Sequence, residues 1–151
     1  MSDLFHPSVS EEFVVKVWEV MADTSHHHYQ ILTKRPDRMA EILARICPTP
    51  LMNVWLGTSV EGQAVVHRID ELREVPAAIR FISFEPLIDS VGDIDLTGID
   101  WAIVGGESGK DARPIKEIWI DDIHRSCRSY ETAMGYLGQR QQETIQEIEW
   151  T

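Results

Sequence analysis

The sequence has little cysteine: only Cys47 and Cys127, far apart and without a nearby pairing motif. Iron–sulfur clusters and structural zinc sites need several Cys or His ligands, so this chain by itself cannot hold an iron–sulfur cluster. No His is placed by sequence to activate either thiol, which indicates two packed cysteines and no nucleophile. The first residues contain no secretion signal, and together with the few cysteines they predict a cytoplasmic, reducing compartment.

Basic charge and long apolar runs are also scarce. Lys and Arg total 14 against 25 Asp and Glu, a net charge of −11. Such a balance repels a phosphate backbone, so non-specific nucleic-acid binding is not expected. No apolar run reaches the ~20 residues of a membrane span, which predicts a protein without a membrane segment. His26, His27 and His28 are consecutive, so their side chains point in different directions and no metal site is expected there.

Predicted strands and helices alternate along the chain. Ser8 and Glu11 have the spacing of a capping box, which predicts a helix from there to about Asp23. Short β-rich runs then predict strands over 29–33, 53–58, 79–84 and 101–104. Apolar residues at helical spacing predict helices after the first, second and fourth strands, whereas none is expected over 85–98. Alternation of this kind is typical of parallel βαβ units, so we predict an α/β fold with at least four parallel strands.

Polar residues follow each predicted strand. In parallel α/β folds the ligand site lies at the carboxyl ends of the strands, so these residues are expected to share one rim. They are Lys34 and Arg35, then Thr58, Ser59 and Glu61, then Glu85, and finally Gly105, Gly106, Glu107 and Ser108, with Arg113 downstream.

Each candidate has a structural alternative. Glu85 could bind the amino group or ribose of a nucleoside-like ligand, or it could cap the turn or pair with Arg80 or Lys34. Gly105 and Gly106 would let a ligand approach the backbone, although a two-glycine turn without the GxGxxG spacing is common. Lys34 and Arg35 suit a carboxylate or phosphate, or are solvated charges. Ser59 is interpreted as a helix cap.

Several strings together resemble a known family. They are MSDLFH, LTKRP, VWLGTSVE, FISFEPL and DWAIVGGESGKDARP. In this order and spacing they resemble the later part of a phage-associated family of unknown function with a radical-SAM-like barrel. Members of that family usually carry an upstream cysteine-rich loop that holds a four-iron cluster, which binds S-adenosylmethionine. The resemblance implies cofactor contacts from Lys34, Arg35, Glu85, Gly105, Gly106, Glu107 and Ser108.

The resemblance also defines the expected organisation. A complete barrel usually needs about 250 residues, so the 151 residues predict an incomplete TIM-type barrel, with a doubly wound parallel sheet as the alternative. We expect a partial barrel domain over 1–128 and a divergent tail over 129–151, with the cysteine loop missing. Open barrel edges further predict a homo-oligomer or a partner that supplies the missing strands. Such an association would bury an edge strand or the faces around Phe13, Trp18 and Trp55.

Three functional hypotheses follow. The first is a truncated family member without catalytic activity of its own, and this chain alone is then expected to carry no cofactor. The second is a segment of a split S-adenosylmethionine-dependent radical enzyme, to which another polypeptide supplies the cluster. The third is a small independent α/β domain that binds a metabolite. No catalytic residue and no substrate follow from the sequence.

Overall fold

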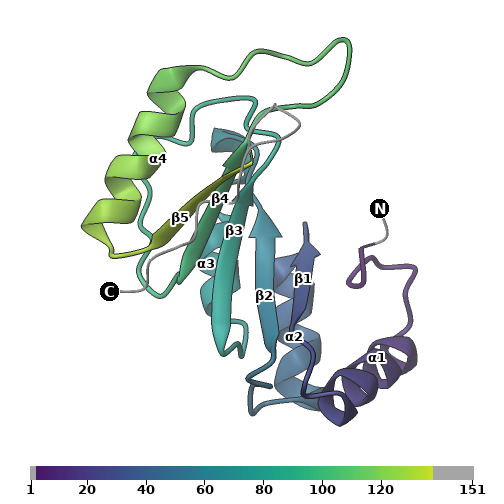
Figure 1. The fold of residues 1–151 in the computed structure, drawn as a ribbon. Helices are drawn as coiled ribbons and strands as arrows, with labels where there is room; N and C mark the ends of the chain where they lie inside the picture. Colours follow the sequence, from purple (N-terminus) through teal and green to yellow (C-terminus); the bar gives the residue numbers. More distant parts are fainter. Residues whose placement is uncertain (1–2, 138–151) are drawn as a thin grey trace.

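The structure is a computed structural model, and it describes residues 3–137 (Figure 1). In chain order the elements are α1 (Glu11–Asp23), β1 (Tyr29–Thr33), α2 (Pro36–Ile46), β2 (Val54–Ser59), the 3₁₀ helix η1 (Gln63–Val65), α3 (Arg68–Arg73), β3 (Ile79–Phe84), β4 (Trp101–Gly105), α4 (Glu117–Ser129) and β5 (Ala133–Leu137). The predicted alternation of strands and helices is confirmed. None of the described helices is long and apolar enough to cross a membrane.

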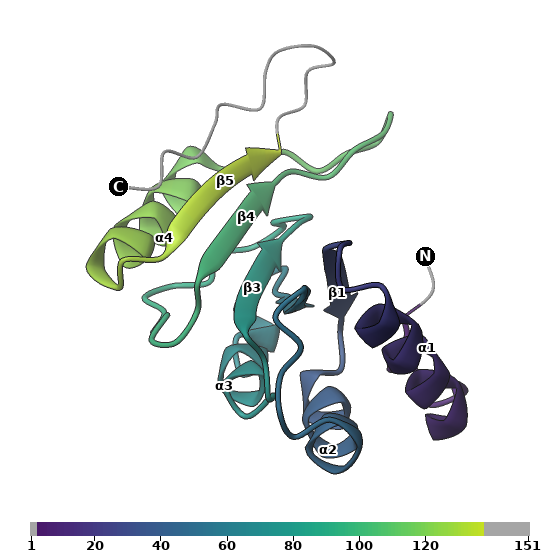
Figure 2. The ribbon, with the colours of Figure 1, turned by 60° about the horizontal axis from the view of Figure 1, so that its bottom comes forward.

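The five strands form one parallel sheet in the order β1-β2-β3-β4-β5. The prediction of an α/β fold with at least four parallel strands is therefore confirmed. The order follows the chain without the reversal that a doubly wound sheet has at its switch point. Figure 2 shows α2, α3 and α4 along one side of the curved sheet, so the helical connections between successive strands share one hand.

Helix α1 starts later than the capping-box spacing predicts. Its N-cap is Ser10, whose side chain accepts a hydrogen bond from the backbone N–H of Phe13 at 3.3 Å. Ser8 lies before the helix and instead contacts the ring of His6. The helix buries Val14, Trp18 and Met21, as their spacing of three to four residues requires.

The main core lies between the helices and the sheet. Residues of alternate strand positions, such as Leu56, Ile82 and Val104, face the helices and are buried with Met39 and Leu43 of α2. The intervening positions face the concave side, where three aromatic rings meet. Trp55 and Trp101 lie 6.1 Å apart and Phe81 and Trp101 5.8 Å apart between ring centroids.

The connection between β3 and β4 has no helix, as expected. It is nevertheless packed, because Leu87, Val91, Ile94, Leu96 and Ile99 are all buried. An irregular apolar segment thus covers the sheet where a barrel unit would place a helix.

The sheet continues past residue 128, where the expected domain boundary falls. Residues 133–137 of the expected tail form β5, which pairs in parallel with β4 from Trp101↔Ala133 to Gly105↔Leu137. The rest of the tail, 138–151, lies outside the described residues.

Candidate functional site

A cavity of about 880 Å³ lies at the carboxyl ends of the strands. The first strand and the segment before α1 supply one wall, and the ends of β2 and β3 with the start of the β4–α4 loop supply the other. Its lining residues are Asp3, His6, Ser8, Val9, Leu32, Thr33, Lys34, Arg35, Ser59, Ser83, Glu85, Pro86, Gly106, Glu107 and Ser108.

The cavity brings together most of the predicted site residues. Lys34, Arg35, Glu85, Gly106, Glu107 and Ser108 all line it. Gly105, the last residue of β4, lies directly behind one of them, because a Cβ atom there would be 3.2 Å from Cδ of Glu85. The carboxyl-end rule thus placed these residues at one edge, while their cofactor role stays a prediction.

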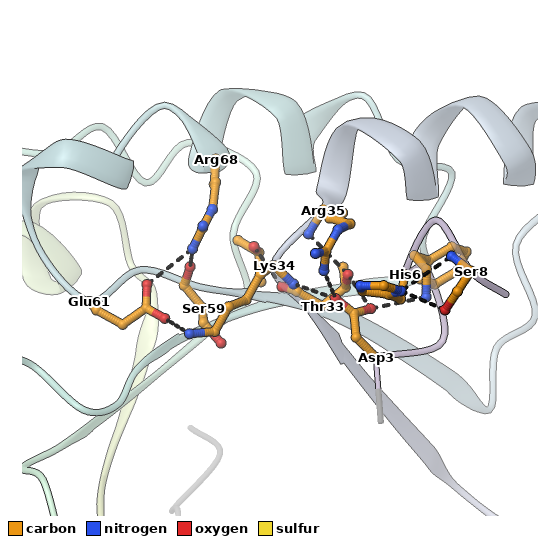
Figure 3. A network of polar contacts seen from close by, with 11 residues as sticks. Asp3, His6, Ser8, Thr33, Lys34, Arg35, Ser59, Glu61 and Arg68 are labelled. Atoms are coloured by element: carbon orange, nitrogen blue, oxygen red, sulfur yellow. Dashed lines mark hydrogen bonds and ion pairs between the residues drawn. The ribbon is translucent and has the colours of Figure 1, made fainter. Parts of the chain in front are cut away.

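The two predicted bases at this edge are already paired (Figure 3). Lys34 forms an ion pair with Glu61, and Arg68 donates to the other oxygen of Glu61 at 3.0 Å. Burial raises the pKa of Glu61, but the hydrogen bond and charge of Lys34 outweigh it and hold the pKa below its ordinary value. Glu61 therefore sits in the network as a carboxylate between two cations.

Arg35 is held in the same way by Asp3. Its Nη1 donates to Oδ2 of Asp3 at 2.7 Å, and Thr33 donates to Oδ1 of Asp3, also at 2.7 Å. Burial raises the pKa of Asp3, yet these hydrogen bonds and those from backbone N–H groups leave it below its ordinary value. An anionic ligand would have to displace a carboxylate to reach either base.

Glu107 is paired as well. Arg113 donates to it through Nε at 2.8 Å and Nη2 at 2.9 Å, and through its backbone N–H at 3.0 Å. The side-chain hydrogen bond of Arg113 comes first among the causes that lower the pKa of Glu107 to about 2. This bidentate pair closes the first part of the β4–α4 loop.

Glu85 differs from the other charged residues of the cavity. Neither partner that the sequence suggested is used: Arg80 donates to the carbonyls of Leu72 and Val75, and Lys34 pairs with Glu61. Within residues 3–137 no hydrogen bond or ion pair of the Glu85 carboxylate is seen. Its oxygens are thus available to a ligand.

Two serines lie beside Glu85: the sequence interpretation missed Ser83, and it placed Ser59 on the rim but interpreted it as a helix cap. Ser59 is the last residue of β2 and not a helix cap, and it stands opposite Ser83 of β3 in the strand register. Both are nearly buried, at 4% and 5% exposure, both line the cavity, and neither hydroxyl is bonded within the described part of the chain. The signal was the alternation of β3, which puts Ser83 on the same face as Glu85 two residues later.

The N-terminal wall was also missed. Asp3, His6 and Ser8 come before the first helix and reach the site only because Asp3 is tied to the end of β1 and Phe5 is fully buried against Trp18. Contacts over about thirty positions of sequence leave no local pattern, so the strand-end rule could not detect them. The available signal was the string MSDLFH, which is among those that carry the family resemblance.

The cysteines do not fit an iron–sulfur cluster. Cys127 is buried on α4, where burial raises the pKa of its thiol to about 11 and so keeps it protonated. Cys47 follows α2, and its Sγ donates to the carbonyl of Thr49. Neither lines the cavity, and no group of three His, Cys, Asp or Glu suited to a metal occurs among the described residues.

Comparison with known proteins gives one match. A family model described as "Protein of unknown function (DUF5131)" matches residues 1–147. No curated protein and no solved structure matches the chain. The family match covers all the described elements, including β5 beyond the expected boundary at residue 128.

Proposed function

The chain belongs to the DUF5131 family of proteins of unknown function, and from this premise we propose that it binds a small cationic metabolite, S-adenosylmethionine, in the cavity at the strand ends. The radical-SAM-like barrel indicated by the sequence strings is part of this proposal, and the consecutive parallel order of the five strands supports it.

The observation that carries the proposal is the unpaired carboxylate of Glu85. The other charged lining residues are matched, Lys34 and Arg35 by Glu61 and Asp3, and Glu107 by Arg113. The charge that a ligand would have to complement is therefore negative, which favours a cation over a carboxylate or phosphate. S-adenosylmethionine carries two cationic groups, an ammonium and a sulfonium, and one carboxylate, so its net charge is positive and one of its cations is left for Glu85.

The neighbours of Glu85 suit the rest of such a ligand. Ser59 and Ser83 present two hydroxyls that can donate to and accept from a ribose. Gly106 has no side chain, so a ligand can approach the backbone closely at the end of β4. Leu32, Val9 and Pro86 supply apolar contact area.

We propose binding, and no reaction, for this chain by itself. A bound four-iron cluster would supply reductive cleavage of S-adenosylmethionine to a radical, and the cysteines of this chain do not fit one. In a split enzyme another polypeptide would supply the cluster ligands. Binding of S-adenosylmethionine without a cluster can be measured in aerobic buffer. The binding proposal can therefore be tested independently of any radical reaction in a split enzyme.

We further propose that the chain associates with a second copy of itself. In the part that the structure describes, β1 and β5 each pair with a neighbour on one side only. Unpaired backbone groups at sheet edges favour addition of another strand. Two copies related by a two-fold axis could pair β1 of each with β5 of the other and so close a ring of parallel strands.

Isothermal titration calorimetry with S-adenosylmethionine tests the binding proposal. Glu85→Gln keeps the shape and removes the charge, and we expect it to weaken binding at least about tenfold, since a charged hydrogen bond contributes about 1.5–3 kcal/mol. Ser59→Ala and Ser83→Ala should each weaken it by less. The matched control is Glu74→Gln, at the exposed end of α3. Equal affinities of Glu85→Gln and wild type would refute the role of Glu85.

A further inference from the structure

The ring of His6 is held in one orientation at the part of the cavity wall that the N-terminal segment supplies. Its backbone is fixed on both sides, because His6 N–H donates to the carbonyl of Asp3 at 3.0 Å and its carbonyl accepts from Val9 at 2.9 Å. The ring nitrogen Nδ1 lies 2.7 Å from Oγ of Ser8 and accepts from the Ser8 backbone N–H at 3.2 Å. Figure 3 shows the ring between Ser8 and the Arg35–Asp3 pair.

These contacts decide which nitrogen carries the proton. A backbone N–H can only donate, so Nδ1 must be the acceptor. In the neutral imidazole the proton then resides on Nε2. Within residues 3–137 no protein partner of Nε2 is seen, although His6 lines the cavity. The wall therefore presents one N–H donor that the described residues leave unused.

The charges around the cavity limit the kinds of ligand group that this N–H donor can bind. Of its three lining carboxylates, Asp3 and Glu107 are each paired with an arginine, and Glu85 has no partner among the described residues. An acidic ligand group in the cavity would be repelled by the carboxylate of Glu85. An uncharged acceptor, such as a heterocyclic ring nitrogen, a carbonyl or a hydroxyl, would not.

We propose that His6 is a specificity-determining residue of the cavity, which donates its Nε2–H to an uncharged acceptor of the ligand while Glu85 binds the cationic end. The inference rests on the proposed function, because it concerns the same cavity. It defines the ligand class further: a molecule with a cation at one end and a neutral heterocycle or hydroxyl at the other, as in an aminoalkyl nucleoside.

The tautomer is tested first, in the absence of ligand. Long-range ¹H–¹⁵N NMR of the full chain should show the neutral His6 ring protonated at Nε2 alone. Nδ1 protonation would overturn the inference at once. This readout depends on neither ligand binding nor Glu85.

Binding is then measured with two probes, S-adenosylmethionine and the uncharged nucleoside adenosine. His6→Gln retains a donor near the position of Nε2 and should bind both like wild type. His6→Phe keeps the ring shape without the donor and should weaken both by about 3- to 10-fold, the effect of one hydrogen bond. The matched control is His124→Phe, on the exposed side of α4. Thermal unfolding verifies that every variant is folded.

The two proposals can fail separately. If S-adenosylmethionine binding depends on Glu85 but not on His6, the role of His6 is wrong and the proposed function stands. If S-adenosylmethionine does not bind, the proposed function falls, and adenosine alone decides the role of His6. If neither probe changes the His6 ¹⁵N resonances in the wild-type chain, the inference is overturned.

Discussion

At the scale of single residues, Gly57 is the position where the sheet tolerates no side chain. A Cβ atom there would lie 2.6 Å from ring carbons of Phe81, which is itself 3% exposed and packs against the ring of Trp101. Gly57→Ala should therefore destabilise the fold by about 1–3 kcal/mol, the usual cost of overpacking. Urea unfolding followed by circular dichroism measures the change.

A double variant separates this clash from a general effect of alanine. Phe81→Leu alone should destabilise by creating a cavity, but it also removes the ring atoms that an added methyl group at position 57 would meet. The destabilisation of the double variant Gly57→Ala with Phe81→Leu should then be smaller than the sum of the two single effects. Additive effects would show that the Phe81 ring does not restrict position 57.

The sequence predicted the positions of the site residues more accurately than their hydrogen-bond and ion-pair partners. The strand-end rule identified Lys34, Arg35, Glu85 and Glu107, because strand boundaries are visible as β-rich runs. It could not show that three of them are paired, since Asp3 and Glu61 approach only in the folded chain. The sequence therefore could not predict that Glu85 is unpaired among the described residues, the observation on which the proposed function rests.

At the scale of elements, the bounds of the strands were predicted more accurately than the first residues of the helices. β1 and β3 have the predicted bounds, because Lys34-Arg35-Pro36 and Glu85-Pro86 end the β-rich runs. The first helix starts at Glu11 with Ser10 as its cap, whereas the capping-box spacing predicted Ser8. β5 was missed because its run, AMGYL, contains a glycine and follows directly on a helix.

The β4–α4 loop carries the strongest pairing of the site, and its pH dependence is predictable. The pKa of Glu107 is lowered from its ordinary 4.5 to about 2 by Arg113. A lowered pKa means that the pairing stabilises the folded state fully above about pH 4.5 and that this contribution is lost as the pH falls toward 2. NMR titration of the Glu107 carboxyl carbon should show this low midpoint.

Two variants examine the cause of that shift. Arg113→Lys keeps the charge but loses the two-point contact, so the pKa of Glu107 should rise toward its ordinary value. Lys110→Gln removes a charge from the same loop without breaking a bond to Glu107, and should leave the midpoint near 2. A midpoint unchanged in Arg113→Lys would contradict the assignment of the shift to the bidentate pair.

At the scale of the whole molecule, the sheet has a helix-covered face, an aromatic concave face and two open edges. Within the described residues, β1 and β5 are those edges. The backbone N–H of Tyr29 donates to Asn53 beside β2, so the alternate residue Gln30 directs its N–H to the open side. Trp18 was expected from sequence at an association surface, but it is 7% exposed in the core, whereas Phe13 of the same expected surface is 55% exposed.

The proposed association therefore predicts a definite response to changes at Gln30. Gln30→Pro removes the outward N–H without touching the β1–β2 ladder and should shift the chain from dimer toward monomer in light scattering at micromolar concentration. Gln30→Thr retains the N–H and should remain dimeric. Because each copy carries a net charge of −11, the dimer should also weaken at low salt, where the repulsion is screened over a longer distance. A wild-type chain that stays monomeric at 0.15 M salt, roughly the physiological ionic strength, would show that a second copy does not pair with these edges.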